Sequence, residues 1–250
     1  MLSVVIVTKN EAHNIVACIE SVAWADEIIV LDSGSNDNTV NLAVAAGARV
    51  IETDWPGYGP QQNRGIDAAA GDWIYSLDAD ERITSALAAE ISAAIRENKF
   101  NVFDVPRRSL FVSRFMQHSG WWPDRTRRLF KKGSARFTNH VIHANLATQD
   151  SVGHLEEAMI HYSFFNYHAV VEKMNRYSSG SAQDLNAMGK RGSLAAAIGH
   201  GLWTFIRTYF LKAGFLDGQV GLILAIANAE GTYYKYLKLW ELQNTQPFQE

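Results

Sequence analysis

With 250 residues, of which 47% are apolar, the chain can bury a full core in one domain and leave material for an appendage. Its single cysteine, Cys18, excludes an intrachain disulfide and is expected to be a packing residue in a reducing compartment. The net charge is only −3, no run reaches the ~18 apolar residues of a membrane-spanning helix, and the apolar run 2–7 is too short for a secretion signal.

The first third of the chain alternates short apolar strands with helices. Strands are expected over residues 2–7, 27–31, 48–51 and 73–77, with one helix marked by Ile15, Ile19 and Val22 and another over 39–46. Such alternation is typical of a mainly parallel sheet, whose ligands lie beyond the carboxyl ends of the strands. The sequence therefore predicts an α/β fold with a site at that edge.

Polar clusters follow the first two strands, at residues 8–11 and 32–37. Ser, Asn, Asp and Gly also favour ordinary helix caps and turns, so each cluster has a purely structural interpretation. A third polar cluster follows the strand 73–77. The structural interpretation does not explain why all three clusters fall at the carboxyl ends of strands.

The third cluster holds Asp78 and Asp80, one residue apart at the end of a strand. An Asp-x-Asp in this position can direct two carboxylates at one cation. Mg²⁺ and Mn²⁺ accept one or two carboxylates together with the phosphates of a substrate. The alternative is a solvated turn, in which Glu81 is a third charge before a helix capped by Thr84.

The charge is distributed unevenly along the chain. Residues 1–95 carry 4 basic and 14 acidic residues, whereas residues 96–136 carry 11 basic and 3 acidic ones. Aromatic residues interleave with the basic ones, a mixture suited to phosphates beside sugar rings or to lipid headgroups. A nucleic acid is the alternative partner, but the acidic remainder would repel it, and we expect none.

Asp124, within the basic segment, is the candidate general base. A carboxylate placed among basic residues in this way is an ordinary group for taking a proton from a hydroxyl. The alternative is a surface ion pair between Asp124 and Arg127 or Arg128.

Histidines follow at positions 140, 143, 154 and 161. A strand over 136–146 is expected, and it would place His140 and His143 on opposite faces, so they do not form a ready chelate. Structural roles are favoured, and whether His140, His143 or His161 joins a metal site is left open.

The chain beyond residue 166 has helical spacing throughout. A first helix carries Val170, Met174 and Tyr177, and apolar helices are expected over 194–212 and 219–242. Aromatic residues with Lys and Arg at the margins suit helices that lie in a membrane interface. Packing of the helices on each other and on the core, or a dimer contact, remains the alternative.

Four segments, in this order and spacing, resemble the signatures of family 2 glycosyltransferases of the GT-A fold: Val4–Glu11, Ile29–Asp37, Asn63–Gly65 and Leu77–Glu81. The resemblance implies an α/β GT-A sheet flanked by helices and a nucleotide-sugar donor, usually a UDP-sugar. It assigns to that donor the residues Thr8, Asn10, Glu11, Asp32, Ser33, Arg64 and Asp78, with Asp32 accepting from the uracil. Asp80, assisted by Asp78, would hold Mg²⁺ or Mn²⁺ on the diphosphate.

The same resemblance extends to the acceptor side, where it supports Asp124 as base and implies acceptor contacts from Trp121, Trp122, Arg127 and Arg128. Within the family the chain looks most like bacterial lipopolysaccharide-core enzymes that add a β-1,4-glucose to the inner-core heptose. Related enzymes carry His-Glu where this chain has His143-Ala144, which weakens any transfer of that histidine's role.

The expectation is thus an inverting, metal-dependent hexosyltransferase, with UDP-glucose favoured as donor and a lipid-linked phosphorylated oligosaccharide as acceptor. Another lipid- or polyprenyl-linked envelope glycan, or a noncatalytic nucleotide-sugar-binding module, is the alternative. We expect a catalytic domain over 1–190, with a donor half at 1–95 and an acceptor half at 96–165, and a helical appendage at 191–250. The expected location is cytoplasmic, peripheral on the inner face of the bacterial inner membrane; the oligomeric state is open.

Overall fold

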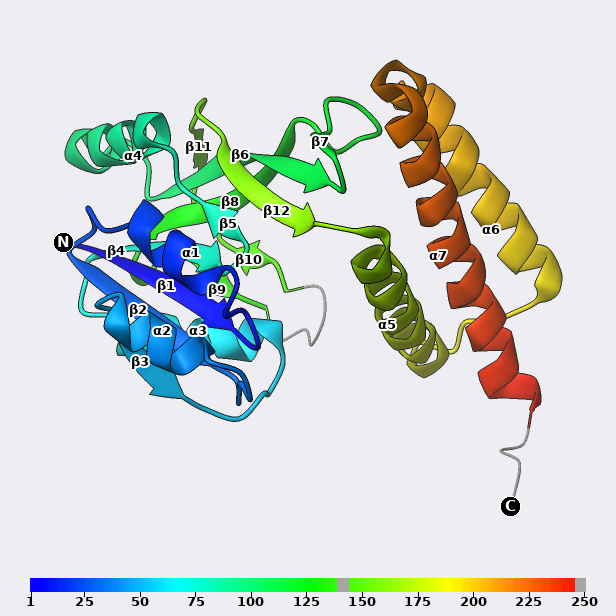
Figure 1. Cartoon of the computed structure of the whole chain (residues 1–250), viewed down its shortest axis with the longest axis horizontal. Coiled ribbons are helices and arrows are strands. Elements are labelled where there is room, and N and C mark those ends of the chain that lie inside the picture. The colour runs from blue at the N-terminus through cyan, green and yellow to red at the C-terminus, as the bar shows by residue number, and fades with distance from the viewer. Residues whose placement is uncertain (139–143, 246–250) are drawn as a thin grey trace. The chain divides into compact units, whose positions relative to one another are not determined.

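Alternating strands and helices at the N-terminus build a parallel sheet, as the sequence predicts (Figure 1). β1 pairs in parallel with β2 on one side and β4 on the other, and β2 pairs with β3. Every residue of β1 is buried, which is typical of a central parallel strand covered on both faces. These elements are β1 (Leu2–Thr8), α1 (Ile15–Ser21), β2 (Glu27–Asp32), α2 (Thr39–Ala45), β3 (Arg49–Glu52), α3 (Tyr58–Ala68) and β4 (Trp73–Asp78).

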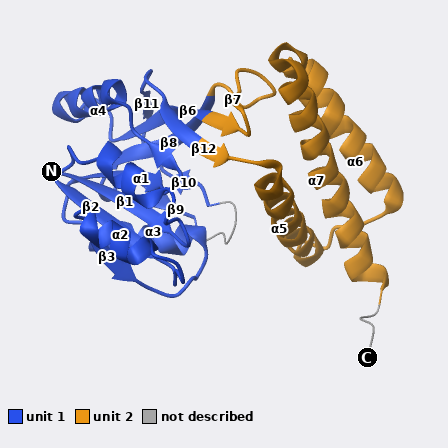
Figure 2. Ribbon diagram, in the orientation of Figure 1, with its two compact units in different colours: residues 1–108, 124–161 blue, residues 109–123, 162–250 orange. Residues whose placement is uncertain are grey.

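The structure is a computed structural model that describes residues 1–138 and 144–245. The chain divides into two compact units, which Figure 2 colours separately. Unit 1 comprises residues 1–108 and 124–161, and unit 2 comprises residues 109–123 and 162–250. The chain crosses between the units at 108/109, 123/124 and 161/162, and α5 (Tyr167–Ala187) packs on α7 (Gly218–Asn244) within unit 2. The catalytic domain over 1–190 and the appendage at 191–250 stay predictions.

The strands after β4 complete the sheet in the order β3-β2-β1-β4-β8-β6-β12-β5. β8 pairs antiparallel with both β4 and β6, so the sheet is parallel in its N-terminal part and mixed beyond it. The expected α/β class with parallel strands flanked by helices is confirmed. The remaining elements here are β5 (Glu81–Arg82), α4 (Ser85–Glu97), β6 (Val102–Phe111), β7 (Arg114–Phe115), β8 (Asp124–Lys131), β11 (Val152–His154) and β12 (Met159–Phe164).

The expected continuous strand over 136–146 is wrong. β9 (Arg136–Phe137) and β10 (Leu146–Ala147) are two short strands that pair antiparallel with each other. Period-2 alternation does not distinguish one long strand from two that pair together. His140 and His143 lie outside the described residues.

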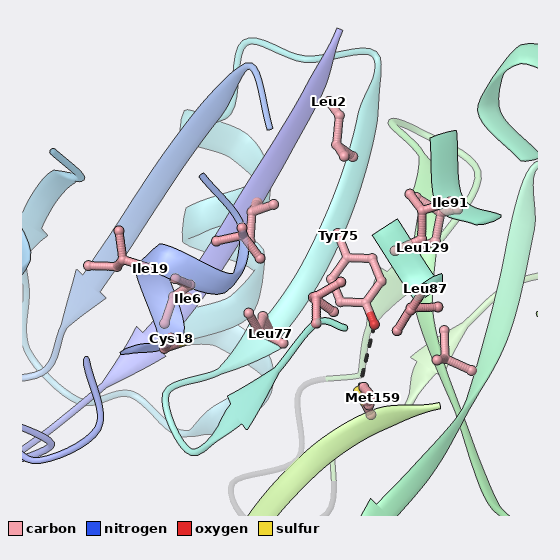
Figure 3. Packing of buried hydrophobic residues seen from close by; sticks show 14 of the residues in the cluster. Leu2, Ile6, Cys18, Ile19, Tyr75, Leu77, Leu87, Ile91, Leu129 and Met159 are labelled. Carbon is pink, nitrogen blue, oxygen red and sulfur yellow. Dashed lines mark hydrogen bonds between the residues drawn. The ribbon is translucent and has the colours of Figure 1, made fainter. Parts of the chain in front are cut away.

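One cluster of the core packs α1 and α4 against the sheet (Figure 3). Tyr75 is buried at its centre, and its hydroxyl donates to the sulfur of Met159 at 3.6 Å. Cys18 is buried in the same cluster, and burial raises the pKa of its thiol far above the ordinary value. The thiol therefore stays protonated, which agrees with a packing residue rather than a nucleophile.

Glu27 ties strands together at the amino-terminal edge of the sheet. Its carboxylate accepts from the Ser3 hydroxyl and from the Ala70 N–H at 2.8 Å, and Arg49 lies 3.5 Å away. Burial alone would raise the pKa of Glu27, but these hydrogen bonds and the charge of Arg49 outweigh burial and lower it.

We expect Glu27→Gln to lower the free energy of unfolding at pH 7 by about 1.5–3 kcal/mol, the usual contribution of hydrogen bonds to a charged group. Because the folded-state pKa of Glu27 is depressed, its stabilisation is present above the unfolded value of 4.5 and lost as pH falls through the folded value. Urea unfolding at pH 7 and below pH 4 checks this: the difference between wild type and variant should shrink on acidification, and a constant difference would contradict the account.

Unit 2 consists mainly of three helices, and two of them begin at side-chain caps. Asn166 accepts from the Ala169 N–H before α5, and Ser193 accepts from the Ala196 N–H before α6 (Leu194–Ile206). A π-helical turn (Arg207–Leu211) and a 3-10 turn (Gly214–Asp217) join α6 to α7. The expected helices after residue 166 are confirmed.

Along the described chain, no single helix is long and apolar enough to cross a membrane. The pair Leu194–Leu211 and Gly214–Asn244, bent by 71°, meets the length and composition criteria together.

Candidate active site

The loops that follow β1 and β2 are tied to each other by hydrogen bonds. Thr8 and Asp32 are partners in the β1–β2 register, so both loops start at the same edge of the sheet. Asn10 Oδ1 accepts from the Asn36 N–H at 2.9 Å, and the Asn10 N–H donates to Ser35 Oγ at 2.8 Å. The two polar clusters seen in the sequence therefore form one rim, at the edge where parallel sheets bind ligands.

Asp32 is buried, and its carboxylate accepts hydrogen bonds from its own loop. Its Oδ1 accepts from the N–H groups of Gly34 and Ser35 at 3.0 and 2.8 Å, and its Oδ2 accepts from the Ser35 hydroxyl. The buried hydroxyl of Thr8 has no hydrogen-bond partner within the described residues. Because unpaired buried polar groups are rare, this hydroxyl is a favourable contact for a ligand. The contact of Asp32 with uracil stays a prediction.

Glu11 links the rim to the loop that follows β4. Its N–H donates to Thr39 Oγ1 at 2.9 Å, and its Oε2 accepts from Asn14 Nδ2 at 2.8 Å. Asn14 Oδ1 accepts in turn from Arg82 Nη2 at 3.1 Å. Glu11 thus lies between the first and third polar clusters, and its donor contact stays a prediction.

The Asn63–Gly65 motif lies on α3 and is largely structural. Asn63 makes two hydrogen bonds with the backbone of Phe137, at 2.9 and 3.0 Å. A Cβ on Gly65 would lie 2.2 Å from a side-chain atom of β1, so only glycine lets α3 approach the sheet this closely. Arg64 is partly exposed and its Nη1 donates to Asp54 Oδ1 at 2.6 Å. Of the three, only Arg64 is placed to meet a ligand.

Gln61 is a buried residue of the site that the sequence analysis missed. Its Nε2 donates to Ser33 Oγ at 3.0 Å and also to Thr53 Oγ1. Gln61 therefore orients Ser33, which was assigned to the donor. A glutamine within a helix carries no signal in the sequence that would have found it.

The three acidic residues after β4 occupy different environments. Asp78 is partly exposed and accepts from Arg128 Nη2 at 2.6 Å. Glu81 is fully buried; its Oε1 accepts from the same nitrogen at 2.7 Å and its Oε2 from the Asp78 N–H at 3.0 Å. Asp80 Oδ2 lies 3.3 Å from His161 Nε2. The alternative of a solvated turn is therefore wrong for Glu81.

The Glu81–Arg128 pair is an ion pair in the interior. Burial raises the pKa of Glu81 above its ordinary value, and Asp78 adds to this, while Arg128 opposes it. Burial would lower the pKa of Arg128, but Asp78 and Glu81 together raise it. The side chain of Arg128 is only 7% exposed and is held between two carboxylates, and its expected contact with the acceptor stays a prediction. The buried carboxylate requires that countercharge.

We expect Arg128→Met to lower the free energy of unfolding by about 3–5 kcal/mol, because it leaves the buried carboxylate of Glu81 without its nearest countercharge. Arg127→Met is the matched control: Arg127 is exposed on the same strand and donates to the Leu146 carbonyl at 2.8 Å. The control should lower the free energy of unfolding by only about 0.5–1.5 kcal/mol, because it removes a single hydrogen bond. Urea denaturation of both variants checks this, and equal losses would contradict the assignment.

Asp124 joins the same network through Arg107, not through Arg127 or Arg128. The two residues face each other in the β6–β8 register, and Arg107 Nη2 and Nε donate to Asp124 Oδ2 at 2.6 and 3.0 Å. Arg107 Nη1 also lies 3.6 Å from Glu81 Oε1. The charges thus alternate from Asp78 through Arg128, Glu81 and Arg107 to Asp124. Asp124 remains partly exposed, as a base must be.

A divalent cation fits this edge only if it takes most of its ligands from elsewhere. No group of three or more His, Cys, Asp and Glu side chains in the described part of the chain is arranged to hold a metal. Three carboxylates, those of Asp78, Glu81 and Asp124, pair with the guanidinium groups of Arg107 and Arg128, and the carboxylate of Asp80 lies beside His161. A hard cation bound through one or two carboxylates and a diphosphate matches that donor set.

The aromatic residues assigned to the acceptor belong to unit 2. Trp121 is partly buried, with ring centroids 5.5 Å from Phe111 and 6.2 Å from Phe164. Trp122 is exposed and precedes the cis peptide bond to Pro123. Arg127 and Arg128 belong to unit 1, so an acceptor surface shared by all four residues stays a prediction.

The model of one protein family, described as "Glycosyl transferase family 2", matches residues 3–150 of the chain. An uncharacterized glycosyltransferase of Rickettsia felis is 33% identical over 96% of this chain and 89% of its own length. The lipopolysaccharide core biosynthesis glycosyltransferase LpsC of Rhizobium meliloti is 26% identical over 94% of this chain and 93% of its own.

A solved structure of glucosyl-3-phosphoglycerate synthase from Mycobacterium tuberculosis, with Mn²⁺, UDP-glucose and phosphoglyceric acid, is 29% identical with a TM-score of 0.39. It covers 43% of this chain and 44% of that one, and a likeness of this extent says nothing about the ligands of the present protein. The family match over more than half of the chain and relatives above 30% identity along nearly all of it agree with each other. The chain belongs to glycosyl transferase family 2, with the α/β GT-A fold of that family.

Proposed function

We propose that the protein transfers a hexose, with inversion, from a UDP-sugar to a lipid-linked phosphorylated oligosaccharide such as the lipopolysaccharide inner core. Glucose from UDP-glucose is the favoured donor. The observation that carries the proposal is the alternating charge network from Asp78 to Asp124, because it connects the residues assigned to donor and acceptor within unit 1. The name of the Rhizobium relative, a lipopolysaccharide core enzyme, supports the acceptor class.

Asp124 acts as the general base in this proposal. Arg107 orients the carboxylate by binding Oδ2 with two nitrogens, while Oδ1 makes no hydrogen bond among the described residues. Oδ1 takes the proton of the acceptor hydroxyl as the acceptor oxygen bonds to the anomeric carbon. The bond from that carbon to the diphosphate breaks, and UDP leaves with the electron pair. One base acting on one face, without a covalent intermediate, inverts the anomeric centre.

Asp80, with Asp78, would hold Mg²⁺ or Mn²⁺ on the donor diphosphate. The ion would supply Lewis-acid stabilisation of the negative charge on the leaving UDP. Arg128 restrains Asp78 through its 2.6 Å ion pair, and His161 lies against Asp80. These two neighbours limit how far either carboxylate can turn, so the pair is oriented before the donor binds.

The rim after β1 and β2 is the proposed nucleoside site. The unpaired hydroxyl of Thr8 and the partly exposed Arg64 are the groups with the most to gain from a polar ligand there. Asn10, Glu11 and Ser33 are already held by neighbouring loops, so the rim costs little ordering when a donor arrives. We place the reaction at the cytoplasmic face of the bacterial inner membrane, where a lipid-linked acceptor would be presented.

A thermal-shift screen of UDP-sugars, with and without Mn²⁺, tests the donor. We expect UDP-glucose with Mn²⁺ to raise the melting temperature most, since a ligand that binds only the folded state stabilises it by mass action. A larger rise with another UDP-sugar would replace glucose. No rise with any UDP-sugar in either condition would refute the donor class, and UDP release on adding acceptor would separate an enzyme from a noncatalytic binding module.

A further inference from the structure

The turn between α6 and α7 presents a large apolar surface, here called the hairpin tip and defined as residues 202–226. Its most exposed apolar side chains are between 49% and 65% exposed. They are Leu202, Trp203, Phe210, Leu211, Phe215 and Leu216. Large apolar side chains exposed in this number around one turn indicate a site of interaction with another apolar phase.

The charge of the tip is one-sided. From residue 194 to residue 229 the sequence holds one acid, Asp217, and two Lys or Arg residues, Arg207 and Lys212. Both cations are exposed, whereas Asp217 is buried. The carboxylate of Asp217 accepts from the His118 N–H at 2.9 Å and lies 4.0 Å from the guanidinium of Arg114. The only negative charge in the segment is therefore withdrawn from the surface and countered inside.

We propose that the hairpin tip docks on a lipid bilayer that carries anionic headgroups. An apolar surface with cations at its margin matches the acyl boundary and headgroup layer of such a leaflet, into which interfacial helices sink about 5–10 Å. A surface that binds a protein normally has a polar rim with hydrogen-bonding groups and charges of both signs around its apolar centre. A second copy of the tip would bring no carboxylate to Arg207 or Lys212.

The hairpin tip is hydrogen-bonded to the loop that carries Trp121 and Trp122. The Ser119 N–H donates to the Lys212 carbonyl at 2.8 Å, in addition to the bond between His118 and Asp217. A Cβ on Gly221 would lie 1.9 Å from the Gly214 carbonyl oxygen, so α7 and the 3-10 turn are also in close contact. This consequence rests on the proposed function: a docked tip would hold Trp121 and Trp122 near the lipid surface, where a lipid-linked acceptor emerges.

Sedimentation of the full chain with vesicles tests the docking. Vesicles of phosphatidylcholine are compared with vesicles that also contain phosphatidylglycerol. Leu211→Glu combined with Leu216→Glu should reduce partitioning at least about tenfold, because it places two charges on the face that would enter the bilayer. Arg207→Gln combined with Lys212→Gln should reduce it about fivefold per cation removed, and only on vesicles with phosphatidylglycerol.

The matched control combines Val171→Glu with Met188→Glu, two apolar residues of unit 2 that are 55% and 69% exposed away from the tip. The control should partition like the wild type, and circular dichroism melting should show that all variants fold. Wild-type protein left in the supernatant with both vesicle types would overturn the proposal, as would an equal loss in the control. So would a wild-type dimer that the two Glu substitutions dissociate without changing vesicle binding. If the protein released no UDP from a UDP-sugar and acceptor in the absence of vesicles, the proposed function would be refuted. The result on vesicle docking would be unaffected.

Discussion

Asp124→Asn is expected to slow sugar transfer by about 10²–10⁴-fold, the usual contribution of a general base, while UDP-sugar binding changes little. The amide keeps the shape of the side chain but cannot take the proton of the acceptor hydroxyl. Calorimetric titration of the UDP-sugar separates binding from turnover, and UDP release with acceptor measures the rate. A loss in kcat with an unchanged donor affinity is the expected result.

Asp67→Asn is the matched control for that variant. Asp67 is an exposed carboxylate of the same unit that also forms an ion pair with an arginine, Arg136, at 2.8 Å through each oxygen. If loss of an Asp–Arg pair were enough to slow transfer, both variants would be slow. Normal turnover of Asp124→Asn would remove its assignment as base and favour the structural ion pair with Arg107.

Asp80→Ala is expected to lower turnover by at least about 100-fold, because a bound metal contributes several kcal/mol of stabilisation to the leaving diphosphate. The fold should persist, since Asp80 is a partly exposed residue at the end of β4, whereas the buried ion pair is formed by Glu81 and Arg128. Turnover in Mn²⁺ and in chelator, together with the melting temperature, tests both statements.

Asp72→Ala is the control for this variant, since Asp72 is an exposed acid that pairs with the N-terminal ammonium at 3.4 Å. It should transfer normally. Undiminished wild-type activity in chelator would exclude the metal role of Asp80. A variant that melts far below the wild type would instead assign Asp80 to the fold, through its contact with His161.

Local patterns were sufficient to predict the elements of the parallel half. The strands β1, β2, β3 and β4 lie within one or two residues of their predicted ranges, because each is a short apolar or β-branched run bounded by turn residues. Thr84 caps α4 as expected, since a cap is a contact between residues three apart. The motif order alone predicted the family.

The tertiary structure decided everything that depends on partners distant in sequence. Arg107 rather than Arg127 or Arg128 pairs with Asp124, because the β6–β8 register brings together residues 17 apart. Arg128 lies in the interior because Glu81, 47 residues before it, is buried there. The pairing of β9 with β10 and the packing of α5 on α7 likewise depend on contacts that periodicity does not contain.

The sequence by itself determined which residue types are present and at which end of each strand they lie, because both follow from neighbours along the chain. Which carboxylate is buried, which arginine neutralises it and which remains exposed for chemistry were decided only when strands distant in sequence paired. Burial of a charge depends on the dielectric and the countercharge around it, and those are properties of the folded chain.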